Sequence, residues 1–262
     1  MKFADYVAKE MVPEGTFLLG YMGSTSHGTH TPKNNPDSID DIDMMGVAFG
    51  PQSCYVGLQR FEQKVYKQDE WDIVTYELRK YVRLLLKQNP NVLGLLWLNP
   101  NHYIHVSEPG KILLANRDMF VSKQAYHSFI GYAHGQLHRM AHYSFNGYMG
   151  AKRKELVERY GYDVKNASHL VRLLRMGIEY LGDGELQVYR KDADELREIK
   201  AGKWTLGQVK KEADRLFHLA QEAYVKSPLP AHPDAKKAQK ILEEMILKWL
   251  RVASIKSINW RE

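Results

Sequence analysis

The chain has 262 residues, of which 44% are hydrophobic and 26% charged. This is the composition of an ordinary globular protein, large enough for one large domain or two small ones. No run approaches the roughly 18 apolar residues that span a bilayer, so we expect no membrane association. Cys54 is the only cysteine, which excludes an internal disulfide and a cysteine-based zinc site and indicates a cytoplasmic protein.

The formal net charge of +6 is unevenly distributed along the chain. Residues 1–110 contain 10 Lys and Arg against 13 Asp and Glu, whereas residues 111–262 contain 27 against 18. An acidic first part followed by a basic second part suggests a metal-binding centre beside a surface for a polyanion such as nucleic acid. The alternative is a solvated helical surface that is simply rich in lysine.

The first part of the chain is predicted to mix strands with helices. Short apolar runs that end at glycine predict strands at residues 15–23 and 41–50, and extended segments follow at 64–66 and 71–74. From Thr75 the apolar residues recur at helical spacing instead.

The helix that begins near Thr75 is predicted to stop at the Asn-Pro-Asn sequence of residues 89–91. A second buried piece covers residues 92–98, and residues 102–107 predict one more strand. The first part therefore has enough strands for a small sheet.

After Pro109 nearly all of the sequence is predicted to be helical. The clearest apolar stripe runs from Leu206 to Ala223 in steps of three and four residues, and it ends before the proline-rich turn of residues 227–234. A last helix is predicted at 235–252. We therefore expect an α+β fold, in which a small mixed-sheet domain (1–110) is followed by a mostly helical domain (111–262). The boundary lies near residues 107–120, without a flexible linker.

A cluster of acids opens the second predicted strand. Side chains alternate between the two faces of a strand, so Asp41 and Asp43 point the same way, about 6–7 Å apart, and Asp40 points to the opposite face. Paired carboxylates suit Mg²⁺ or Mn²⁺. Asp72, an acid between two apolar residues on a later strand, is the best candidate for a third ligand.

A Gly23-Ser24 turn precedes these acids and follows the first strand. Such a turn presents backbone N–H groups to an anion, and Ser24 adds a hydroxyl donor. The turn would hold the phosphates of a nucleoside triphosphate, and the acids would hold the metal ions that bridge those phosphates. Asp72 could also accept the proton of the attacking group. The alternative is an accidental acidic turn.

This order of features resembles the DNA polymerase β nucleotidyltransferase superfamily, which is marked by a strand, Gly-Ser, a helix, Asp-x-Asp and a third acid. Segments such as "SIDDIDMMGVAFGP", "SHLVRLLRMGIEYLGDGELQVYR" and "SPLPAHPD" are similar to the nucleotidyltransferases assigned to an RNA repair pathway, the RlaP group. The resemblance covers about residues 15–245. It implies a polymerase-β-like catalytic domain followed by helices, and metal-dependent nucleotidyl transfer with RNA as the acceptor.

Carried over residue by residue, the resemblance assigns Gly23 and Ser24 to the phosphate turn, Asp41 and Asp43 to the paired metal ligands, and Asp72 to the third acid. Two features depart from the group. Sixteen residues separate Ser24 from Asp41, and the extra residues 30–38 are expected to form a polar loop at the mouth of the site. Gly94 stands where an acid is expected in relatives.

Three further groups of residues attract attention. His134, His138 and His142 share one helix face that could hold a metal, but a polar face near RNA or solvent is the favoured interpretation because no carboxylate interleaves with them. Lys152 and Arg153, beside aromatic residues, could contact RNA phosphates or face solvent. Arg172 and Arg175 could hold triphosphate or RNA phosphate, or form structural ion pairs.

We therefore predict a nucleotidyltransferase that uses Mg²⁺ or Mn²⁺ to move a nucleoside monophosphate from a nucleoside triphosphate to an acceptor, releasing pyrophosphate. The expected acceptor is an RNA end, with tRNA among the candidates, held by the basic helical part. Two alternatives stay open: transfer to a protein or small molecule, and a catalytically silent RNA-binding or antitoxin-like protein.

Overall fold

A computed structural model describes residues 10–32, 34–35, 38, 40–141 and 151–258. The side chains of residues 141, 152–153 and 254–258 are outside that description.

The first part contains the strands and short helices predicted from its apolar runs. In chain order its elements are β1 (Thr16–Tyr21), α1 (Gly23–His27), β2 (Ile42–Ala48), α2 (Ser53–Val56), β3 (Gln63–Gln68), β4 (Trp71–Glu77), α3 (Leu78–Leu86), α4 (Pro90–Leu93), the 3₁₀ turns η1 (Gly94–Trp97) and η2 (Pro100–His102), and β5 (Tyr103–Val106). All five predicted extended segments are confirmed as strands. The predicted switch to helix near Thr75 is also confirmed, with α3 beginning at Leu78 because the buried Glu77 carboxylate caps the backbone N–H groups of Arg79 and Lys80.

The strands of the described residues form one five-stranded sheet in the order β3-β4-β2-β1-β5. β2 and β4 are parallel, and the other neighbouring pairs are antiparallel. The register sets Asp43 of β2 opposite Asp72 of β4, and Asp72 opposite Lys67 of β3. The mixed sheet thus brings side chains from three strands into one row.

The two faces of the sheet have different cover. On β2, Met45 and Val47 belong to the main apolar cluster, which includes helices of both parts of the chain, whereas Met44 packs on the other face with Met11 and Ile73. Because alternate residues share a face, Asp43 lies on the same side as Met45 and Val47. The carboxylate of Asp43 therefore points toward the helix-covered side of the sheet.

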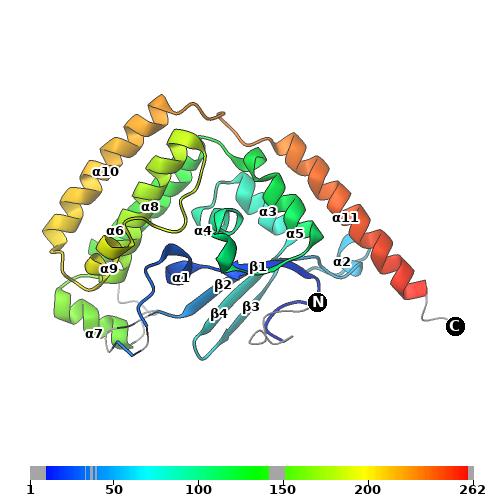
Figure 1. Ribbon diagram of the computed structural model, residues 1–262, viewed down its shortest axis with the longest axis horizontal. Helices are drawn as coiled ribbons and strands as arrows, with labels where there is room; N and C mark the ends of the chain where they lie inside the picture. The colour runs from blue at the N-terminus through cyan, green and yellow to red at the C-terminus, as the bar shows by residue number, and fades with distance from the viewer. Residues whose placement is uncertain (1–9, 33, 36–37, 39, 142–150, 259–262) are drawn as a thin grey trace.

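The rest of the chain is helical, as predicted. Its elements are α5 (Glu108–Ala115), the 3₁₀ turn η3 (Arg117–Phe120), α6 (Ala125–Ala141), α7 (Ala151–Tyr160), α8 (Val164–Asp183), α9 (Ala193–Lys200), α10 (Leu206–Lys226) and α11 (Ala235–Ile258). Helix α11 continues six residues beyond its predicted end and runs along one side of the molecule, above the sheet (Figure 1). No helix among the described residues is both long and apolar enough to cross a bilayer.

Helix α8 connects the two parts of the molecule. Its Leu173 and Tyr180 belong to the main cluster with Phe17 of β1, while its Leu170 belongs to a second cluster with Val209 of α10. Helix α8 therefore packs in both apolar clusters, and its residues line one cavity together with Asp43.

Candidate functional site

The turn after β1 is in direct contact with an acid of β2. The Met22 N–H donates to the Asp43 carbonyl at 2.8 Å, and Gly23 adopts a positive φ of 57°. A Cβ atom built on Gly23 would lie 1.9 Å from Asp43 Oδ2. Only glycine satisfies both the backbone conformation and the space, so the sequence places its Gly-Ser turn against this carboxylate for a physical reason.

Asp43 lies in an unfavourable electrostatic environment. Burial is the largest cause that raises its pKa, to about 6; Lys165 acts in the opposite direction, and Asp72, Asp41 and Asp40 each raise it further. The acids that were predicted to act together are thus close enough to repel one another. An added cation would relieve that repulsion.

Asp72 has a positively charged partner. Its carboxylate accepts a hydrogen bond from Lys67 Nζ at 2.7 Å, and the Lys67 side chain is 66% exposed. Within the described residues, no three His, Cys, Asp or Glu side chains are grouped closely enough to hold a metal ion. The predicted convergence of Asp41, Asp43 and Asp72 on one ion would therefore require side-chain rotation, with Lys67 leaving Asp72.

A cavity of about 270 Å³ lies beside the turn. On one side it is lined by Gly23, Ser24 and Asp43, and the Ser24 hydroxyl lies 3.3 Å from His30 Nδ1. Asp41 and Asp72 do not line it. Of the three acids that were predicted to bind metal, the cavity therefore faces Asp43 alone, beside the turn.

Further lining residues of the cavity come from α8 and α9. Lys165, His169 and Arg172 of α8 and Lys200 of α9 line it. Of these four residues, Arg172 alone was predicted from the sequence to bind phosphate. The polar residues of α8 recur at helical spacing, but a polar face on a helix usually meets solvent, so the spacing alone did not reveal a cavity wall.

Asp40 also lines the cavity, and this corrects an expectation. Its buried carboxylate accepts hydrogen bonds from Lys200 Nζ and from the Thr31 N–H, the latter at 2.8 Å. The prediction that Asp40 points away from Asp43 was wrong because β2 begins at Ile42, so the alternation of a strand does not extend back to Asp40.

Residues of the helical part form hydrogen bonds with the end of α1, and each of these bonds involves a backbone group. His27 Nδ1 lies 2.9 Å from the Val188 carbonyl, the Arg190 N–H donates to the His27 carbonyl at 3.2 Å, and the Arg197 guanidinium donates to the Gly28 carbonyl. Burial lowers the pKa of His27 well below its usual value. The neutral ring therefore carries its proton on Nδ1, because a carbonyl can only accept.

Arg175 forms ion pairs that join three helices. Its guanidinium forms ion pairs with Asp192 at 2.8 Å, with Glu212 at 2.9 Å and with Glu195, so it joins α8 to α9 and α10. It does not line the cavity. Acceptor binding by Arg175 is an untested prediction, and these three carboxylates already occupy its donors.

The remaining predicted residues are partly outside the described residues. His134 stacks on Phe217 with ring centroids 4.3 Å apart, whereas His142 lies outside the described residues, as do the side chains of Lys152 and Arg153. The proposed roles of the last two in acceptor binding stay predictions.

The two departures from the family pattern have definite positions. In the loop of residues 30–38, the Ser38 hydroxyl donates to the Thr31 carbonyl at 2.7 Å, which folds the described part of the loop back on itself. Gly94 is buried, and a Cβ there would meet Met22 at 3.4 Å and Val188 at 3.7 Å. The side chain of an acid at position 94 would leave the backbone between carbon atoms of Val188 and of Met22, the residue before Gly23.

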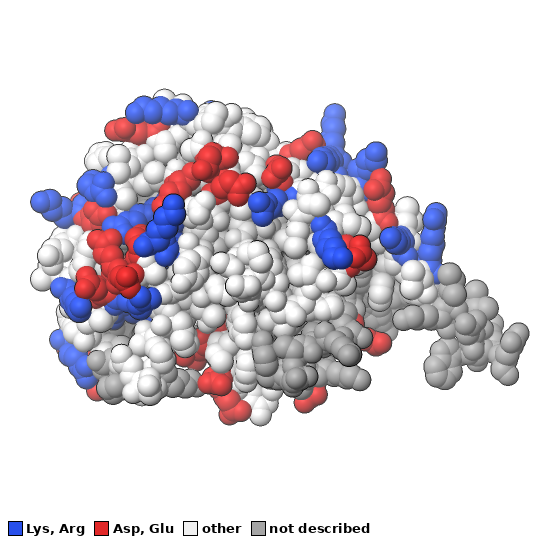
Figure 2. Space-filling model, in the orientation of Figure 1, with Lys and Arg blue, Asp and Glu red and all other residues white. Residues whose placement is uncertain are grey.

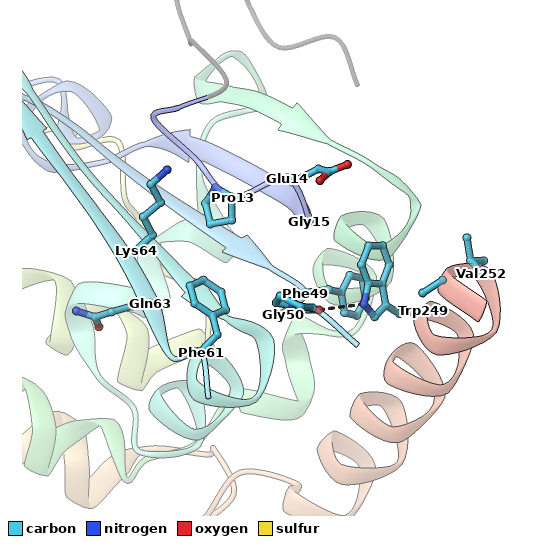
Figure 3. Close-up of a pocket in the computed structure, with 12 residues that line it drawn as sticks. Pro13, Glu14, Gly15, Phe49, Gly50, Phe61, Gln63, Lys64, Trp249 and Val252 are labelled. Carbon is cyan, nitrogen blue, oxygen red and sulfur yellow. Dashed lines mark hydrogen bonds between the residues drawn. The ribbon is translucent and has the colours of Figure 1, made fainter. Parts of the chain in front are cut away.

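A larger cavity, of about 600 Å³, lies at the other end of β2. Figure 3 shows Phe61 and the stacked rings of Phe49 and Trp249 around it, with Lys64 on one side. Its lining is mainly apolar, and Phe49 is about 20 Å along the strand from Asp43. Despite its size, this cavity lacks the turn and the acids, so the smaller cavity is the candidate site.

The charged surface of the helical part is mixed in sign. On the face drawn in Figure 2, Lys and Arg side chains are interleaved with Asp and Glu over the helices. The excess of positive charge in residues 111–262 therefore does not form one continuous basic patch on that face.

The model of the RNA repair pathway DNA polymerase beta family, RlaP, matches residues 2–214. The chain belongs to this family. The match confirms the resemblance predicted from the sequence, and it covers the Gly23 turn, the acids and all of α8. RlaP membership indicates a polymerase-β-like nucleotidyltransferase, and relatives of that kind generally use a divalent metal and a nucleoside triphosphate. No curated protein matches the chain.

Proposed function

We propose that this RlaP protein transfers a nucleoside monophosphate from a nucleoside triphosphate to an RNA end and releases pyrophosphate. One observation carries the proposal: the Gly23 turn lies against the Asp43 carboxylate, with Asp72 as its cross-strand neighbour. A phosphate held at this turn would lie beside carboxylates whose mutual repulsion favours a cation. Nucleotidyl transfer needs this combination of an anion site and a cation site.

The residues of the site have distinct roles in this proposal. The backbone of the Gly23 turn and the Ser24 hydroxyl donate hydrogen bonds to phosphate oxygens. Asp41, Asp43 and Asp72 provide the hard oxygen ligands that Mg²⁺ or Mn²⁺ prefers. A bound divalent cation would neutralise charge on the triphosphate and lower the pKa of the attacking hydroxyl. In this proposal Asp72, whose carboxylate is partly exposed, accepts the proton of that hydroxyl once Lys67 moves away.

An RNA end is the acceptor that the family description favours. The net positive charge of residues 111–262 also favours a polyanion. Among RNAs, tRNA is a candidate that a screen can test directly.

The test is an incubation with each of the four labelled nucleoside triphosphates, Mg²⁺ and total cellular RNA. We expect label in RNA from at least one nucleotide, and at least about a 100-fold loss with Asp43→Asn, because the anion that should bind the cation is removed. Asp69→Asn is the matched control, since Asp69 lies in the β3–β4 turn with a φ of 53°, which Asn also tolerates. Full transfer by Asp43→Asn would refute the proposal.

A catalytically silent RNA-binding role is the second candidate, and the Lys67–Asp72 ion pair favours it, because a lysine already neutralises one of the acids. That role predicts RNA affinity that does not depend on Mg²⁺ and survives Asp41→Ala. If label is recovered in protein or in a small molecule, the proposed nucleotidyl transfer holds but the acceptor is not RNA.

A further inference from the structure

Helix α8 presents a polar stripe to the cavity. Lys165, Ser168, His169 and Arg172 are spaced i, i+3, i+4 and i+7, which places them on one helix face, and all four line the cavity together with Gly23 and Ser24. The other faces of α8 are packed in the apolar clusters. The stripe is therefore fixed in position by packing.

Arg172 is the informative member of the stripe. Within the part of the chain that the structure describes, its guanidinium forms no ion pair with a carboxylate, and its Nη1 lies 3.1 Å from the Met176 sulfur, a weak acceptor. Burial, the largest cause, and Arg190 lower its pKa, Asp192 raises it, and the result is about 9, so Arg172 is still a cation at neutral pH. Its neighbour Arg175, one turn away, has three acids.

A guanidinium that is largely withdrawn from water and has no carboxylate in hydrogen-bond contact is costly, so this arrangement favours an anionic ligand. The other charges of the cavity are largely balanced: Asp40 is paired with Lys200, and Lys165 acts on Asp43. Arg172 remains as the surplus positive charge. A volume of about 270 Å³ is small for a complete nucleotide but suits a short phosphate chain.

We propose that Arg172, assisted by Lys165, binds the β- and γ-phosphates of the donor nucleotide. Helix α8 then belongs to the donor site and not to the acceptor site, and it selects triphosphates over monophosphates. The planar guanidinium fits two phosphate oxygens at once, which lysine cannot do. This inference rests on the proposed function for the identity of the nucleotide, but not for the presence of the phosphate site.

Isothermal titration calorimetry with inorganic tripolyphosphate and the full-length protein tests the inference without any transfer reaction. We expect the wild type to bind tripolyphosphate more tightly than orthophosphate. Arg172→Met should weaken tripolyphosphate binding by about 10- to 100-fold, the loss expected for hydrogen bonds between charged partners. Arg172→Lys should restore part of it. The matched control is Lys203→Met, at an exposed lysine paired with Glu198 outside the cavity, which should bind like the wild type.

A thermal melt separates binding from a structural role. Removing a cation that is not paired with a carboxylate should leave the melting temperature of the ligand-free protein unchanged or higher, and should reduce its rise with tripolyphosphate. A lower melting temperature without ligand, unchanged affinity in Arg172→Met, or no binding by the wild type would each overturn the inference.

Kinetics then separate the inference from the proposed function. If transfer occurs, Arg172→Met should raise the KM for the nucleotide by at least about tenfold and leave the KM for RNA unchanged. The reverse pattern would place Arg172 in the acceptor site and reject the inference alone. If the wild type transfers nothing but binds tripolyphosphate through Arg172, the inference stands and the proposed transferase function fails.

Discussion

Asp43 combines burial with several like charges, and each of these disfavours its ionised form. Its carboxyl is partly covered by the Gly23 turn, and the charges of its cross-strand neighbour Asp72 and of Asp41 act on it. Lys165 offsets the repulsion only in part, since the pKa still rises to about 6. At neutral pH and without metal, the ionised Asp43 carboxylate is therefore less stable in the folded protein than in the unfolded chain.

This imbalance predicts a pH-dependent stability. The folded pKa of Asp43 lies above the unfolded value of about 3.9, so the native state binds the proton more tightly, and stability falls as pH rises from about 4 to 6. In the absence of divalent metal, Asp43→Asn should exceed the wild type in free energy of unfolding by about 1–3 kcal/mol at pH 8, and by almost nothing near pH 4. Urea unfolding at both pH values, in the presence of EDTA, measures the difference.

Addition of Mg²⁺ at pH 8 should stabilise the wild type and leave Asp43→Asn unchanged, because the cation relieves the repulsion that the variant lacks. Asp69→Asn serves as the control and should follow the wild type throughout. Equal stability of wild type and Asp43→Asn at pH 8 would show that the acids do not strain the folded state.

At the same scale, the sequence predicts the acids better than their partners. Asp43 and Asp72 follow from strand patterns that persist in the structure. Asp40 does not, because a pattern cannot say where a strand begins to within one residue. The pairing of Lys67 with Asp72 and the position of Arg172 depend on strand register and helix packing, which join residues far apart in the chain.

Among the elements, α9 is held to the first part of the chain by a buried ion pair. The Lys200 side chain is 9% exposed and the Asp40 side chain 2%, and the lysine also donates to the Thr29 carbonyl at 3.3 Å. Burial lowers the pKa of Lys200, while Asp40 raises it. The pair closes one side of the cavity and sets the distance between α9 and the loop before β2.

Lys200→Met should reduce the free energy of unfolding by about 3–5 kcal/mol, because among the described residues it leaves the buried Asp40 carboxylate with the Thr31 N–H as its hydrogen-bond donor. Chemical denaturation measures the loss. Adding Asp40→Asn to Lys200→Met should recover part of it, since no buried charge then remains. Lys203→Met, at a 63% exposed side chain, is the control and should lie within about 0.5 kcal/mol of the wild type. A loss as small as that of the control would mean that Asp40 is solvated.

The elements themselves were largely predictable, and their arrangement was not. The stripe from Leu206 predicts α10 because burial of one helix face imposes a regular spacing. The parallel pairing of β2 with β4 leaves no such local pattern, although it is the contact that sets Asp72 beside Asp43. The candidate site thus depends on a sheet order that short-range patterns do not encode.

For the whole molecule, the main apolar cluster extends further along the chain than the family match does. The match ends at residue 214, within α10, whereas the main apolar cluster includes Ala238 and Met245 of α11. Trp249 of α11 stacks on Phe49 with ring centroids 4.8 Å apart, and its Nε1 donates to the Gly50 carbonyl at 3.1 Å. Helix α11 is therefore part of the folded unit, bound to the end of β2 that is farthest from the acids.

This placement predicts that a substitution in α11 lowers the free energy of unfolding without changing phosphate binding at the candidate site. Trp249→Ala should reduce the free energy of unfolding by about 2–3 kcal/mol, less than for a fully buried tryptophan because this ring is only partly covered. Tripolyphosphate affinity, measured below the unfolding transition, should stay at the wild-type value because the cavity lies about 20 Å away along β2. Leu247→Ala, at a 56% exposed residue of the same helix, should change stability by no more than about 0.5 kcal/mol. If Trp249→Ala instead weakened tripolyphosphate binding without loss of stability, α11 would be coupled to the site through the sheet, and the core would not act merely as its support.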